Sequence, residues 1–382
     1  MDVTGYLQRL KESGNFRSIP GAVLTGVTDY SSNDYMGLAA DEELHREFLA
    51  DAGLVSLPMT SSASRLLAAR QKEYCDLELF LSDQYQQYRR DDTATLLFNS
   101  GYHANTGLLQ AIAGRDTLIL ADRLVHASII DGIVLSRAKF LRFPHNDFDR
   151  LSEMLDKNAP EFRHVIVVVE SVYSMDGDFA DIDRLIDLKR LHGNVTLYVD
   201  EAHAFGVMGP KGLGLVAASK APAEVDVTVG TFGKAAASMG AFAVTTSVMR
   251  HFLINSARSF IFSTALPPVM AAWTRCAVAR LLTMDSRREH LTLLGGKLRE
   301  VIMKYSRQQP VASHIQPLVV GDPKLAVVLS RRLLDNFRIK ALPIRKPTVP
   351  AGTERLRFSL SADMQLHDIQ LLDEALSQLF PA

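Results

Sequence analysis

Short apolar runs that end in polar residues alternate with stretches of helical periodicity in the middle of the chain. Three β-rich runs of this kind occupy residues 163–171, 193–203 and 225–234. The apolar positions between the first two runs recur near a period of 3.6 residues and are Ile182, Leu185, Ile186, Leu188 and Leu191. A periodic segment that closes at a glycine, here Gly193, predicts a helix. The succession of strand, helix and strand indicates an α/β fold, with a mostly parallel central sheet and helices on both faces.

Polar residues stand at or just past the ends of these runs. Glu170 follows the apolar part of the first run, Asp200 that of the second and Lys234 closes the third. Because ligands in open α/β sheets collect beyond the carboxyl ends of the strands, these three positions predict a functional site.

The pattern changes near residue 270, and a long helical stretch extends from about residue 266 to residue 305. It is followed by an apolar run at 315–322, a helix near 324–336, a second β-rich stretch and a last helix that ends at Leu379. The first forty or so residues resemble a helix and a strand that pack on the rest. We therefore predict an N-terminal segment (1–42), a large domain (43–270) and a smaller α+β C-terminal domain (271–382).

Composition narrows the class of protein. A chain of 382 residues with 47% hydrophobic and 22% charged content buries a large core, as soluble enzymes do. The formal net charge of −1 gives no electrostatic reason to expect nucleic acid or an anionic membrane as a partner. No apolar run approaches the roughly 18 residues that span a bilayer, so we expect a cytoplasmic chain. Cys75 and Cys276 offer no metal-ligand spacing, and we expect reduced thiols and no metal.

Several motifs and residues also have an interpretation without catalytic function. "DEAH" (200–203) also occurs in helicases, but those enzymes need a G-x-x-x-x-G-K-[ST] loop, which this sequence lacks. "GPKGLG" (209–214) is a weak match to a dinucleotide fingerprint, and a surface loop is the better interpretation. Taken alone, Lys234 would be a solvated lysine, Asp200 a strand-end cap and His203 a core histidine.

Together these residues favour Schiff-base chemistry. Small residues around Lys234 let a flat ring approach its amine, and an aspartate such as Asp200 would keep the pyridine nitrogen of pyridoxal phosphate (PLP) protonated. "NSGYHAN" (99–105) follows a strand and opens a helix, so the amides of Gly101 and Tyr102 and the hydroxyl of Thr231 are candidates to bind the phosphate.

At this point the chain resembles the α-oxoamine synthases, which are fold-type-I PLP-dependent transferases. The matching stretches are "YSSNDYMGL" (30–38), "NSGYHAN" (99–105), "ADRLVHASIIDG" (121–132), "FPHND" (143–147), "ESVYSMDGD" (170–178), "VDEAHAFGV" (199–207), "TFGKA" (231–235), "FIFSTALPP" (260–268) and "PTVPAGTERLR" (347–357). The resemblance implies an acyltransferase that condenses an amino acid with an acyl-CoA or an acyl carrier protein thioester and releases CO2. Local matches favour the alanine-using branch, although branches that use serine or glycine share the catalytic core.

The resemblance also implies roles for single residues at the cofactor. Lys234 would form the Schiff base and exchange the proton at the amino acid's α-carbon, while Asp200 would hold the pyridinium. His126 would stack on the ring, and Ser174 and His203 would contact the 3′-oxygen. The phosphate would be bound by Gly101, Tyr102 and Thr231, and by Thr264 from a neighbouring subunit, which implies a homodimer with shared active sites.

On the substrate side, the resemblance implies that Arg345 pairs with the amino acid's carboxylate and that Arg17, Asn33 and Thr348 face the substrates. The sequence departs from the family's pattern at 59–70, where Ser or Ala replaces most glycines, and at Lys346, where relatives have proline. A catalytically silent protein with the same fold is the alternative, and the retained Lys234 argues against it.

Overall fold

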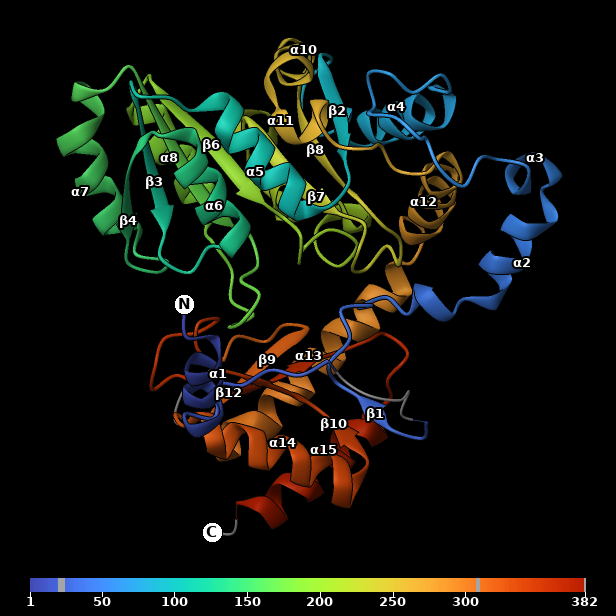
Figure 1. The fold of residues 1–382 in the computed structure, drawn as a ribbon, viewed down its shortest axis with the longest axis vertical. Coiled ribbons are helices and arrows are strands. Elements are labelled where there is room, and N and C mark those ends of the chain that lie inside the picture. Colours follow the sequence, from blue (N-terminus) through green and yellow to red (C-terminus); the bar gives the residue numbers. More distant parts are fainter. Residues whose placement is uncertain (20–24, 307–309, 381–382) are drawn as a thin grey trace. The chain divides into compact units, whose positions relative to one another are not determined.

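A computed structural model describes residues 1–19, 25–306 and 310–380 (Figure 1). Contacts within the chain divide it into two compact units. The terminal unit comprises Met1–Tyr35, Ser174–Asp178 and Ser286–Ala382, and the sheet unit comprises Met36–Tyr173 and Phe179–Asp285. The domain boundaries at residues 42 and 270 remain predictions from the sequence, and each unit is described by itself below.

The sheet unit is built on seven strands in the order β2-β8-β7-β6-β5-β3-β4. Their bounds are β2 Thr93–Phe98, β3 Thr117–Asp122, β4 Lys139–Phe143, β5 His164–Glu170, β6 Val195–Asp200, β7 Val227–Thr231 and β8 Ala241–Thr246. Neighbouring strands from β4 to β7 are parallel, and β8 runs antiparallel to both of its neighbours. The predicted α/β class, with a mostly parallel sheet, is confirmed.

Both faces of this sheet are covered, which explains the unbroken apolar run of β5. Val165, Val167 and Val169 face a core shared with α7 (Phe148–Asn158) and α8 (Ile182–Leu191), whereas Ile166 and Val168 face the opposite core. That second core is formed with α5 (Gly101–Ile112), α6 (Ala127–Ser136), α10 (Ser247–Ser256) and α11 (Arg258–Ile261), and α5 packs against α6 (Figure 1). Alternate side chains of a strand point to opposite faces, so a doubly covered strand is apolar throughout.

The remaining helices of the sheet unit are α2 (Glu42–Ala50), α3 (Ala52–Val55), α4 (Lys72–Gln86), α9 (Leu215–Ala218) and α12 (Pro268–Leu281). The helical stretch predicted from residue 266 to 305 is two helices, because α12 ends at Leu281 and α13 spans Asp285–Tyr305. Asp285 carries negative charge at the start of α13, where a helix terminus favours it. No helix in the described ranges is long and apolar enough to cross a bilayer.

The terminal unit has the predicted α+β character. Its three-stranded antiparallel sheet has the order β11-β12-β9, with bounds Leu342–Ile344, Arg355–Ser359 and Ile315–Val319. A two-residue strand near the N-terminus, β1 (Thr28–Asp29), pairs in parallel with β10 (Ile339–Lys340). The helices are α1 (Val3–Glu12), most of α13, α14 (Pro323–Phe337) and α15 (Leu366–Leu379). The expected helix and strand of the first forty residues are thus α1 and β1.

Candidate active site

Lys234 follows β7 in the sheet unit, and its Nζ lies 2.8 Å from Nε2 of His203. His203 is buried in the turn after β6. This turn approaches the lysine segment closely because Gly206 adopts φ +86°, and a Cβ there would lie 2.6 Å from the Cβ of Ala235. Two residues that are 31 positions apart in sequence are thereby held in contact, as the prediction of a shared site required.

Asp200, the last residue of β6, is a buried carboxylate with two donors. Its Oδ2 accepts from Nδ2 of Asn105 at 2.7 Å, and its Oδ1 accepts from the backbone N–H of Ala202 at 2.8 Å. Asn105 is buried as well, donates to Oγ of Ser128 and accepts from the hydroxyl of Tyr198. Asn105 lies in the motif "NSGYHAN" (99–105), but the sequence pattern predicts no role for it. The signal in the sequence that could have identified Asn105 is an amide side chain on the apolar side of a predicted helix.

We expect Asn105→Ala to destabilise the chain by about 2 to 4 kcal/mol, because it leaves the Tyr198 hydroxyl and one oxygen of Asp200 without their partner. Urea unfolding of the full chain measures this. Thr106→Ala is the matched control on the same helix, since the Thr106 hydroxyl donates to the carbonyls of Tyr102 and His103 in its own helix. Equal losses for the two variants would contradict a special contribution of the hydrogen bonds that join Asn105 to Asp200 and Tyr198.

His126 is the N-cap of α6, where its Nδ1 accepts from the backbone N–H of Ser128 at 3.2 Å. Burial lowers the pKa of His126, with Asp200 opposing this effect and Lys234 adding to it. A neutral imidazole is therefore favoured at neutral pH, and a neutral ring has a lower desolvation cost when an aromatic group covers it.

The N-terminus of α5 presents backbone N–H groups that are suited to bind an anion. Ser100 caps the helix by accepting from the backbone N–H of His103 at 3.2 Å, so the preceding amides of Gly101 and Tyr102 are left for a ligand. A Cβ on Gly101 would lie 3.8 Å from the side chain of Thr231, which brings the predicted phosphate residues together. The Tyr102 side chain instead turns outward and contacts Asp131.

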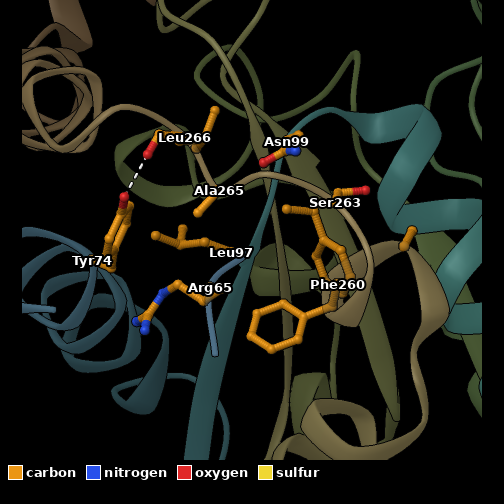
Figure 2. A pocket seen from close by; sticks show the side chains of 10 residues that line it. Arg65, Tyr74, Leu97, Asn99, Phe260, Ser263, Ala265 and Leu266 are labelled. Carbon is orange, nitrogen blue, oxygen red and sulfur yellow. Dashed lines mark hydrogen bonds between the residues drawn. The ribbon is translucent and has the colours of Figure 1, made fainter. Parts of the chain in front are cut away.

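Thr264 lies beside this helix start, since its carbonyl accepts from Nδ2 of Asn99 at 2.6 Å. It also forms a β-bridge with Ser64, in the stretch where the sequence departs from the family's glycines. Figure 2 shows the pocket that Arg65, Tyr74, Asn99 and Ser263 line here. Arg65 lies over the Tyr74 ring and pairs with the buried Glu78 at 3.2 Å, so the segment is anchored by side chains.

Glu201 changes the interpretation of "GPKGLG" as a surface loop. Gly212 and Gly214 are buried, and Gly214 adopts φ +99° where a Cβ would lie 2.1 Å from Oε2 of Glu201. Glu201 also accepts from the backbone N–H of Val216 at 3.0 Å. The surface-loop prediction is wrong for these two glycines, because the loop folds over a buried carboxyl group next to Asp200 in the chain.

Burial raises the pKa of Glu201 to about 7, against the hydrogen bonds that it accepts. A carboxyl with a raised pKa in the folded state stabilises the fold below its unfolded pKa, and this contribution is lost as pH rises through the folded pKa. We expect Glu201→Gln to gain stability relative to the parent between pH 5 and 7, by at most about 1.4 kcal/mol per pH unit, and to level off above. Parallel curves of unfolding free energy against pH for the two proteins would contradict this.

The other predicted site residues lie in the terminal unit and form two clusters. In the first cluster, Arg357 donates from Nε to the carbonyl of Ser174 at 2.6 Å and from Nη2 to Oδ1 of Asn33 at 3.2 Å. Arg357 is 3% exposed, and its remaining bonds go to the hydroxyls of Tyr35 and Ser359. Arg357 was not predicted as a site residue, although it lies in the matching stretch 347–357.

Arg357 carries a buried charge that has no anionic partner among the described residues. None of the described acidic side chains pairs with it, whereas Arg355 on the same strand pairs with Asp176. A buried charge without compensation is costly, so such a guanidinium is suited to receive a ligand's carboxylate.

The second cluster joins Arg17, Arg345 and Thr348. Arg17 donates from Nη2 to the Thr348 hydroxyl at 3.1 Å, and Arg345 donates from Nη1 to the carbonyls of Gly14 and Phe16. Burial lowers the pKa of Arg345, and the charge of Arg17 lowers it further. No ion pair links either arginine to an acid in the described ranges, so the cluster is positive and suits a second anion.

The sheet unit therefore has the groups that PLP requires. The amine of Lys234 contacts the imidazole of His203. The buried carboxylate of Asp200 accepts two hydrogen bonds, which position it for a pyridinium nitrogen. The 12-residue helix α5 presents its first amides to a phosphate. The residues fit the cofactor that the sequence predicts.

Comparison with known proteins agrees with this fit. The model of the aminotransferase class I and II family matches residues 28–376. A protein of Glaesserella parasuis, named "putative 8-amino-7-oxononanoate synthase", is 46% identical over 377 residues, which cover 96% of this chain and 97% of the relative. Among solved structures, serine palmitoyltransferase of S. paucimobilis with a bound PLP-myriocin aldimine has a TM-score of 0.85 at 27% identity, covering 98% and 96% of the two chains. The 8-amino-7-oxononanoate synthase of Francisella tularensis has a TM-score of 0.76 at 26% identity, covering 93% and 98%.

The chain belongs to the aminotransferase class I and II family and has the fold-type-I architecture. More narrowly, it is a PLP-dependent acyltransferase of the α-oxoamine synthase type, as the resemblance implied.

Proposed function

We propose that the enzyme condenses L-alanine with a pimeloyl thioester, of CoA or acyl carrier protein, to give 8-amino-7-oxononanoate, CO2 and the free carrier, a step of biotin synthesis. The observation that carries this proposal is the 46% identity, over nearly the full length of both chains, to the relative of that name. The positive cluster of Arg17, Arg345 and Thr348 adds support, because a pimeloyl chain ends in a carboxylate.

Residues of the chain bind the cofactor and move the proton at the substrate. PLP, when bound, supplies an electron sink for the charge that develops at the amino acid's α-carbon. Lys234 takes and returns the proton at that carbon, while His203 orients its amine. Asp200 would hold the pyridinium proton, His126 would cover the ring, and the amides of Gly101 and Tyr102 with Thr231 would bind the phosphate.

On the substrate side, the structure supports a revision of the sequence assignment. Arg345 was expected to hold the amino acid's carboxylate, but Asn33, another predicted substrate residue, contacts Arg357 instead. We assign the amino acid's carboxylate to Arg357 and Asn33, and the terminal carboxylate of the acyl chain to Arg17, Arg345 and Thr348.

A second candidate is a serine palmitoyltransferase type of reaction, in which serine and a fatty acyl thioester are the substrates. The similarity to solved serine palmitoyltransferases favours it, because their TM-scores exceed that of the Francisella enzyme. The α-oxoamine synthases that use glycine, 2-amino-3-ketobutyrate CoA ligase and 5-aminolevulinate synthase, share the same catalytic groups.

Product identification by mass spectrometry separates these candidates. The purified enzyme is mixed with alanine, serine or glycine and with pimeloyl, palmitoyl, acetyl or succinyl thioesters. We expect a product from alanine and the pimeloyl thioester, with kcat/KM at least about 10-fold above other pairs, since one specific charge contact is worth about 1.5 to 3 kcal/mol. A product that needs serine and a palmitoyl thioester would move the enzyme to the alternative class.

We also propose a homodimer in which Thr264 completes the phosphate site of the neighbouring subunit. Support comes from the family resemblance, in which the residue that matches Thr264 reaches the phosphate of the neighbouring subunit. Sedimentation equilibrium is expected to give twice the mass of the chain.

A further inference from the structure

Glu170 is a buried carboxyl group that the proposed mechanism does not use. It ends β5, is 3% exposed and lies in register with Asp200 of the neighbouring parallel strand. Neighbouring strands are about 4.8 Å apart, and paired side chains point to the same face of the sheet. Its Oε1 is buried and has no hydrogen-bond partner among the residues that the structure describes.

The two carboxyl groups differ in the donors that surround them. Asp200 accepts from Asn105 at 2.7 Å and from the backbone N–H of Ala202 at 2.8 Å. Within the part of the chain that the structure describes, Glu170 has one donor, the backbone N–H of His126. Two adjacent buried carboxyl groups do not both ionise readily, and the negative charge resides on the group with more donors. Here that group is Asp200.

A third carboxylate, Asp122, ends β3 on the other side of Glu170. It accepts from the backbone N–H groups of Leu124 at 2.7 Å and Asn146 at 2.8 Å, and His145 Nδ1 lies 3.0 Å from it. Since Ala121 lies opposite Val168, Asp122 is aligned with Val169 and not with Glu170. Asp122 therefore has its own donors and interacts less strongly with Glu170 than Asp200 does.

The surroundings of Glu170 shift its pKa in both directions. Burial is the largest effect and Asp200 the next, and together they raise the pKa of Glu170 to about 8. Lys234 and the His126 amide oppose this rise, and Asp122 adds a smaller increase.

We propose that Glu170 holds a proton in the working enzyme and thereby leaves the negative charge of this strand edge on Asp200. Glu170 is then a positioning residue that acts through Asp200 and through the backbone of His126. The role at the cofactor rests on the function proposed for Asp200, whereas the protonation of Glu170 does not depend on the substrates.

The infrared carbonyl band of a protonated carboxylic acid tests this in the PLP-loaded enzyme. We expect a band that disappears with a midpoint near pH 8 and is absent from Glu170→Gln. Glu201→Gln is the matched control, because Glu201 is an equally buried carboxyl whose raised pKa is nearer 7, and its removal should leave the band near pH 8. The proposal is overturned if neither the parent nor the Glu201→Gln enzyme shows such a band. This test does not require that Glu170→Gln folds.

The affinity for PLP shows whether Glu170 acts as a neutral acid or as a charged carboxylate. At pH 7 we expect Glu170→Gln to bind PLP within about 3-fold of the parent, because an amide replaces a neutral acid of the same size. Asp200→Asn removes a charge-assisted contact and should weaken PLP binding by about 10- to 100-fold. Losses of equal size in the two variants would show that Glu170 works as an anion and would refute the proposal. If Asp200→Asn alone bound PLP normally while the infrared band behaved as expected, the error would lie in the function proposed for Asp200.

Discussion

Lys234→Ala is expected to abolish the borohydride-reducible bond to PLP while still binding the free cofactor. The carboxylate of Asp200 and the amides at the start of α5 do not depend on the lysine, so noncovalent binding persists. Turnover should fall at least about 10³-fold, because both the nucleophile and the acid/base group are lost. Absorbance spectra, reduction followed by peptide mapping, and single-turnover rates measure these effects.

Lys220→Ala provides the control for this experiment. Lys220 is also in the sheet unit but pairs with Asp187 through a half-exposed side chain, and its loss should leave cofactor and turnover unchanged. If peptide mapping labelled a lysine other than Lys234 in the parent enzyme, the assignment of the site would be wrong.

The sheet of the large unit could be predicted because its signals are local. Val165 to Val169 are apolar at every position, which only a doubly covered strand requires, and α8 has a clear helical period. The break between α12 and α13 was missed, since a boundary of three residues does not interrupt a helical pattern that continues on both sides.

The candidate site was predictable only where a residue's type suggests its chemistry. Lys234, Asp200 and His203 stand at strand ends, and the structure places Lys234 and His203 in contact. Asn105 and Arg357 were missed because their importance arises from partners that lie far away in sequence, Asp200 and Asn33. Nothing in the local pattern separates the buried Arg357 from Arg355, which has Asp176 as its counter-ion.

The two arginine clusters of the terminal unit predict opposite effects on the two substrates. Arg357→Lys should weaken alanine binding by about 30- to 1000-fold, because a bidentate pair in a buried site is worth about 2 to 4 kcal/mol and an ammonium cannot reproduce the fork. Arg345→Lys should instead raise the KM of the pimeloyl thioester and leave alanine binding within about 3-fold, since it lies with Arg17 and Thr348. Spectral titration with alanine and steady-state kinetics with the thioester measure the two effects separately.

Lys346→Ala is the control for the second variant, because Lys346 is the exposed neighbour of Arg345 and shows no ion pair within the described ranges. Loss of an exposed charge is screened by solvent and should change the thioester's KM by less than about 3-fold. If Arg345→Lys weakened alanine binding and Arg357→Lys did not, the amino acid's carboxylate would belong to Arg345, as the family resemblance first implied. The buried charge of Arg357 would then serve to hold Ser174 and Asn33 in place, through the two hydrogen bonds that it donates to them.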